Sequence, residues 1–178
     1  PRGGDFTYSE SEIDLMVADI EMAKNLGVQG IVSGVLYENH TLDIENTTRL
    51  IKACEGLPFT FHRAFDWIPN KEEALDQLDD LGIQRILTSG GSTKAIDALE
   101  TLTTWNRNYN TAILPGGGIN SSNYKAFKTA GFEEIHLSAT KIIDKGEVEI
   151  PMNALKYLIE NGHILCDSKE VSTICEGG

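Results

Sequence analysis

The chain has 178 residues, of which 40% are hydrophobic and 24% charged, the composition of an ordinary globular domain. Its formal net charge of −12, from 27 acidic and 15 basic side chains, argues against nucleic acid or an anionic membrane as a partner, because both require a basic surface. No apolar run reaches the roughly 18 residues of a membrane span. We expect one domain over residues 1–178.

The cysteine content indicates the compartment. Cys54, Cys166 and Cys175 are odd in number and carry no CxxC spacing, which fits a reducing, cytoplasmic environment. Cys54 lies in a helical pattern and is expected to be a buried core side chain. No signal peptide opens the chain, but it begins at Pro1 without an initiator Met, so a lost N-terminal segment is compatible with the sequence.

Five short runs rich in strand-forming residues recur along the chain, at residues 30–36, 59–65, 85–89, 111–114 and 134–138. Amphipathic helical patterns fill the gaps between them. A capping box at Ser9 predicts a helix that ends before Gly27. The same signals predict helices over 71–81 and 121–130, capped by Asn70 and Asn120 and followed by Gly82 and Gly131.

This repeated βα unit predicts an α/β fold with a parallel sheet and right-handed crossovers. A doubly wound sheet and a (β/α)8 barrel both fit the alternation. Polar residues at the carboxyl ends of nearly every strand favour the TIM-barrel type. A complete barrel takes about 250 residues, so we expect an incomplete barrel fragment with about six parallel strands, which lacks the first βα units and has open sheet edges.

The segment Phe59–Asp66 is the most informative part of the sequence, because it brings His62, Arg63 and Asp66 to the end of an apolar strand. Continued strand alternation would place His62 and Asp66 on a polar inner face, and Arg63 with the phenylalanines on the outer face. Three such groups are costly to desolvate unless they face a cleft.

Three residues are the candidates for acid–base catalysis: His62, Asp66 and His136. Histidine titrates near neutral pH, and Asp66 is placed to orient His62 or to act beside it. Barrel geometry predicts that the three converge at the carboxyl mouth. A histidine that is merely buried and hydrogen-bonded is the alternative for His62.

A second group of residues is expected to bind a small anion. Gly116, Gly117 and Gly118 open onto a helical pattern, where free backbone N–H groups can hold phosphate or carboxylate, although a tight turn needing positive φ is the alternative. Arg63 suits bidentate binding of an anion, or else a structural ion pair. The full set of candidates for substrate or anion binding is Arg2, Asp5, Arg63, Ser89, Gly116, Gly117, Gly118 and Ser138.

Six sequence blocks, at residues 1–6, 30–36, 60–66, 87–91, 115–119 and 136–138, resemble in order the signature blocks of the CutC family. The resemblance implies a cytosolic, homo-oligomeric TIM barrel linked to copper homeostasis. The cysteine-bearing blocks of the family's first two strands would precede Pro1. Cu(I) is therefore expected as a ligand of a full-length protein, whereas this chain's own metal ligands are unknown, and Cys166 and Cys175 are expected to lie too far apart to share an ion.

Two functions therefore remain. The resemblance implies a copper-handling protein, because Cu(I) prefers thiolate and thioether ligands. The polar residues at the strand ends indicate instead an enzyme that acts on a small anionic or phosphorylated metabolite by histidine-based acid–base catalysis. The sequence leaves open whether any reaction is catalysed, since barrels host many chemistries.

Overall fold

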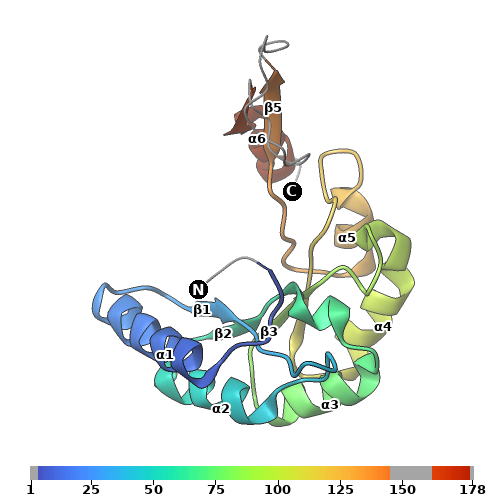
Figure 1. The fold of residues 1–178 in the computed structure, drawn as a ribbon. Coiled ribbons are helices and arrows are strands. Elements are labelled where there is room, and N and C mark those ends of the chain that lie inside the picture. The colour runs from blue at the N-terminus through green and yellow to red at the C-terminus, as the bar shows by residue number, and fades with distance from the viewer. Residues whose placement is uncertain (1–3, 145–161, 177–178) are drawn as a thin grey trace, which may run out of the picture.

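The computed structural model describes residues 4–144 and 162–176. Helices and strands alternate through the first of these ranges (Figure 1). In chain order the elements are α1 Glu10–Asn25, β1 Ile31–Ser33, α2 Ile44–Ala53, β2 Phe59–Phe61, the 3₁₀ helix η1 Arg63–Trp67, α3 Lys71–Asp80, β3 Arg85–Thr88, the 3₁₀ helix η2 Ala95–Ala98, α4 Leu99–Asn108, β4 Ala112–Pro115, α5 Tyr124–Ala130, β5 Thr140–Asp144, β6 Gly162–Cys166 and α6 Ser168–Glu176.

The central sheet is parallel, with strand order β1-β2-β3-β4, as a barrel fragment requires. The expected strand at 134–138 is reduced to one parallel bridge between Gly116 and His136. β5 and β6 pair antiparallel and project away from this sheet (Figure 1). The partial-barrel fold is therefore confirmed, but the described residues contain four paired parallel strands and not about six.

The two faces of the sheet differ, because strand residues alternate between them. Helices α1 to α4 cover one face (Figure 1), and against them Phe59, Phe61 and Ile86 are buried. On the opposite face lies the row in which Val32 pairs with Thr60 and Thr60 with Arg85. Val32 is 62% exposed, and in the described part of the chain β1 has a neighbour on one side only. The expected open edge is thus present at β1.

The helix ends test the capping predictions. The capping box at Ser9 is formed, since its hydroxyl accepts from the Glu12 N–H and Glu12 accepts from the Ser9 N–H. Asn70 caps α3 in the predicted way. Asn120 does not cap α5, because its side-chain oxygen accepts from the N–H of Ser122 within a turn. That helix therefore starts later than predicted, at Tyr124.

The strand predicted over 59–65 ends at Phe61. The backbone N–H of His62 still donates to Ser33, and the chain then turns into η1. Strand alternation stops at that point, so the prediction that Arg63 and Asp66 lie on opposite faces is wrong. The tight 3₁₀ turn, with about three residues per turn, brings residues i and i+3 to the same side instead.

Among the helices in residues 4–144 and 162–176, none is both long enough and apolar enough to span a bilayer.

Candidate functional site

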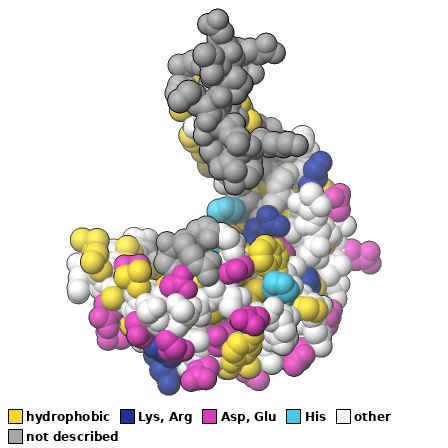
Figure 2. Space-filling view, viewed as in Figure 1, with side chains coloured by type: hydrophobic (Ala, Val, Ile, Leu, Met, Phe, Trp, Pro, Cys, Tyr) yellow, Lys and Arg dark blue, Asp and Glu magenta, His cyan; other side chains and the backbone are white. Residues whose placement is uncertain are grey.

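The polar residues expected to form a site lie at one end of the parallel sheet. His62 follows β2, Ser89 follows β3 and the glycine run 116–118 follows β4. We call these segments, together with η1, the carboxyl rim. Figure 2 shows a histidine next to a basic side chain on the face drawn there, with acidic side chains close by.

Asp66 is the centre of the hydrogen bonding at this rim. Its carboxylate accepts from the Thr88 hydroxyl at 2.5 Å, from the N–H and hydroxyl of Ser89 at 3.1 Å, and from the Gly91 N–H at 3.1 Å. It also accepts from Nε of Arg63 at 2.7 Å. The side chain is only 8% exposed. With its lone pairs engaged, Asp66 is placed to hold the rim together, and its catalytic role stays a prediction.

Arg63 receives its orientation from these neighbours. Nε donates to Asp66 and Nη2 donates to the Ser89 hydroxyl at 2.8 Å. The guanidinium lies against Gly117, where a built Cβ would come within 3.6 Å of Nη1. The side chain is still 43% exposed. An arginine that is held at two of its nitrogens and is still partly exposed is preorganised to bind an anion.

The glycine run has a clear structural role. Gly117 and Gly118 have φ values of 123° and 68°, which side chains rarely adopt. At Gly116 a Cβ would lie 2.5 Å from a methyl group of Leu87. The Gly117 carbonyl accepts from the Ala95 N–H at 2.9 Å, which ties the run to η2. Anion binding by the run itself stays a prediction.

His62 is half-buried, and its ring lies 4.8 Å from the ring of Phe6, measured between centroids. Burial lowers the pKa of this histidine below its ordinary value of 6.5. Nδ1 accepts from the Ala64 N–H at 3.3 Å, so the neutral ring carries its proton on Nε2. In this tautomer Nε2 is the hydrogen-bond donor of the ring.

His136 lies at the same end of the sheet but apart from His62. Its N–H donates to the Pro115 carbonyl at 2.8 Å, and its side chain packs beside Gly116. Three strand positions separate it from β2, about 14 Å at ~4.8 Å per strand. No hydrogen bond or ring contact joins the two histidines in the described part of the chain. The structure thus brings Arg63, Asp66 and Ser89 together with the glycine run, and leaves His136 exposed beside them.

Two further candidates, Asp5 and Ser138, hydrogen-bond within their own segments. Asp5 accepts from the N–H of Thr7 at 3.1 Å in an exposed turn. Ser138 is exposed, with its hydroxyl 3.5 Å from that of Thr140. Arg2 falls outside the described residues. Their predicted part in ligand binding is untested.

Lys71 is a rim residue that the sequence did not single out. Its ammonium donates to the carbonyls of Asp66 at 3.3 Å and Ile68 at 2.8 Å, and so holds the end of η1. The aliphatic part of its side chain lies where a Cβ on Gly91 would be. In the sequence, a lysine directly after an N-cap asparagine looks the same whether it is solvated or holds a neighbouring turn, so its role could not be predicted.

The described residues do not fit a soft-metal centre. Within residues 4–144 and 162–176 no three His, Cys, Asp or Glu side chains are placed to hold an ion together. Cys54 is buried, as predicted, and its thiol donates to the Leu50 carbonyl. Burial raises the pKa of that thiol, which disfavours the thiolate that binds copper. Cys166 and Cys175 are free and exposed.

Comparison with known proteins identifies the relatives. The model of the CutC family matches residues 1–141. The chain belongs to the CutC family. A family protein CutC of Enterobacter sp. (strain 638) is 42% identical over 142 residues, which is 79% of this chain and 58% of the relative. The copper homeostasis protein cutC homolog of Homo sapiens is 40% identical over 149 residues, covering 82% of this chain and 55% of the relative.

A solved structure agrees with this assignment. The putative copper homeostasis protein CutC from Streptococcus agalactiae superimposes with a TM-score of 0.72 at 35% identity, over 76% of this chain and 68% of that one. The chain spans less than three fifths of the length of the curated relatives described above. The family match ends at residue 141, so β6 and α6 lie beyond it.

Proposed function

We propose that this CutC family chain serves in copper homeostasis. The observation that carries the proposal is the family match over residues 1–141, together with mouse and human relatives that are named copper homeostasis protein cutC homolog. The three free cysteines favour a cytoplasmic setting for this role. Within residues 4–144 and 162–176 no three His, Cys, Asp or Glu side chains are placed to hold a copper ion together.

Growth in copper tests this role. The chain is expressed in a bacterium whose own CutC gene has been deleted, and growth is followed as copper is raised. We expect better growth than with an empty vector, at equal levels of folded protein. Growth equal to that of the empty vector contradicts the proposal for this chain.

A titration of the purified chain with Cu(I), in competition with a chelator, tests the ligands separately. We expect no tight stoichiometric site, because Cys54 is buried and the described residues form no metal cluster. Stoichiometric uptake that is lost in Cys166→Ser or Cys175→Ser would overturn that view.

The carboxyl rim supports a second candidate function, the binding of a small phosphorylated or carboxylated metabolite. The observation that favours it is the guanidinium of Arg63, held by Asp66 and Ser89 and still 43% exposed. A fixed arginine loses little conformational freedom when it binds an anion, so more of the electrostatic attraction is retained as affinity. His62, neutral and protonated on Nε2, would then donate a hydrogen bond to a substrate oxygen, and a catalytic role remains part of the proposal.

Thermal unfolding with inorganic phosphate tests the rim. A ligand that binds only the folded state raises the unfolding temperature. We expect phosphate to stabilise the wild-type chain and to have little effect on Arg63→Gln, with Arg63→Lys intermediate because lysine lacks the planar fork. The matched control is Arg107→Gln, which removes an exposed arginine of α4. Equal stabilisation of wild type and Arg63→Gln contradicts the proposal.

A further inference from the structure

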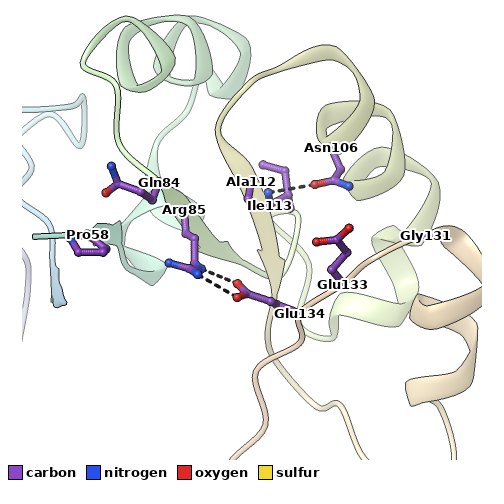
Figure 3. A pocket seen from close by; sticks show the side chains of 9 residues that line it. All are labelled: Pro58, Gln84, Arg85, Asn106, Ala112, Ile113, Gly131, Glu133 and Glu134. Atoms are coloured by element: carbon purple, nitrogen blue, oxygen red, sulfur yellow. Dashed lines mark hydrogen bonds and ion pairs between the residues drawn. The ribbon is translucent and has the colours of Figure 1, made fainter. Parts of the chain in front are cut away.

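A separate cavity lies at the opposite end of the sheet from the carboxyl rim (Figure 3). Its volume is about 400 Å³, within the range of sites for small molecules. Arg85 and Ala112, the first residues of β3 and β4, line it together with Pro58, which precedes β2. Asn106 of α4 lines it too, as do Glu133 and Glu134, which follow α5.

One part of this wall is electrically balanced. Arg85 and Glu134 form a two-point ion pair, with Nε facing Oε2 and Nη2 donating to Oε1 at 2.8 Å. This contact raises the pKa of Arg85 and lowers that of Glu134. The pair fixes the segment after α5 against the start of β3, and the two charges neutralise one another.

Glu133 adds one negative charge to the cavity wall that the pair of Arg85 and Glu134 does not neutralise. Its carboxylate makes no hydrogen bond or ion pair with the described residues, and its side chain extends toward Asn106 (Figure 3). The oxygen of that amide accepts from the Ile113 N–H at 3.1 Å, which fixes its orientation and leaves a second lone pair. Asn106 also lies near the C-terminal end of α4, where the helix dipole is negative. The cavity therefore combines a free carboxylate, an oriented amide oxygen and apolar carbon.

We propose that this cavity binds a small organic cation, a primary ammonium on a short aliphatic body. The ammonium donates to the Glu133 carboxylate and to the Asn106 oxygen, and the aliphatic part lies against Pro58 and Ala112. A hard divalent metal ion fits less well, because it requires several oxygen ligands and Glu134 is already paired with Arg85. A carboxylate ligand is opposed by the remaining negative charge.

The test is a titration of the full chain with butylamine at low salt, followed by NMR. Three ligands serve for comparison. Butanol has the same chain length without a charge, butyrate carries the opposite charge, and Mg²⁺ is an inorganic cation. We expect butylamine to bind and to shift the amide signals of residues 106, 112 and 133. Glu133→Gln should weaken this binding about tenfold or more, the loss of one charge-assisted hydrogen bond. Glu100→Gln, an exposed glutamate of α4 outside the cavity, is the matched control and should bind as wild type does.

A second variant tests whether binding requires the space of the cavity as well as the charge of Glu133. Ala112→Leu fills the space and keeps every charge, so it should also abolish binding, while thermal unfolding confirms that it remains folded. The proposal is overturned if the wild-type chain shows no binding at millimolar butylamine, or if Glu133→Gln binds as tightly as wild type. It is equally overturned if butanol binds as well as butylamine, or if Mg²⁺ displaces it from the same residues.

Discussion

His62 makes a prediction about stability that follows from its burial. The native state keeps the ring neutral, with a pKa below 6.5, whereas the unfolded chain takes up a proton near that pH. Below about pH 6.5 the unfolded state therefore binds more protons, and stability is lost as the pH falls. His62→Asn, whose side-chain oxygen can replace Nδ1 as an acceptor, cannot titrate. Urea unfolding from about pH 7.5 to about pH 5 should show wild type losing stability relative to this variant, by at most about 1.4 kcal/mol per pH unit. Parallel pH curves for the two proteins would show that His62 titrates alike in both states.

The same residues show how far single positions can be predicted. The sequence correctly brought His62, Arg63 and Asp66 to the exit of a buried strand, because three polar groups after Phe59–Phe61 are costly to bury elsewhere. The prediction that Arg63 and Asp66 lie on opposite faces was wrong, since it assumed that the strand continues. The hydrogen bond from the Ala64 N–H to His62 is part of the turn that ends the strand. The spacing of hydrophobic residues in the sequence does not predict such a turn.

At the scale of elements, Asp66 joins η1 to the loop after β3. Asp66→Asn replaces one acceptor oxygen by an NH₂ group that faces the donors of Ser89 and Gly91. It also leaves Arg63 without its charged partner. We expect a loss of about 3 kcal/mol in the free energy of unfolding, since charge-assisted hydrogen bonds contribute about 1.5–3 kcal/mol each. Chemical denaturation measures this, with Asp97→Asn, an exposed residue of η2, as the control. A loss no larger than that of the control would mean that the loop does not depend on Asp66.

At the scale of the whole molecule, the order of strands and helices was predictable because each βα unit marks its own ends. The boundaries that failed depend on partners. The run at 134–138 has strand-forming residues, yet it makes a single bridge, between His136 and Gly116, directly after β4. Glu134 forms an ion pair with Arg85 instead. β5 and β6 were not among the runs expected to form strands, although they pair antiparallel with each other. The cavity at the amino ends of the strands was not predicted either, because its lining residues come from separate elements.

The parallel sheet has a consequence for how the chain folds. In this sheet β2, β3 and β4 each pair with the strand one βα unit earlier, as Phe59 does with Ile31 and Ala112 does with Arg85. Every new strand therefore finds its partner already made when the chain emerges from the ribosome. Loop closure then costs about the same entropy at each step, because the entropy grows only slowly with loop length. The sheet can assemble during synthesis, one unit at a time, in the direction of translation.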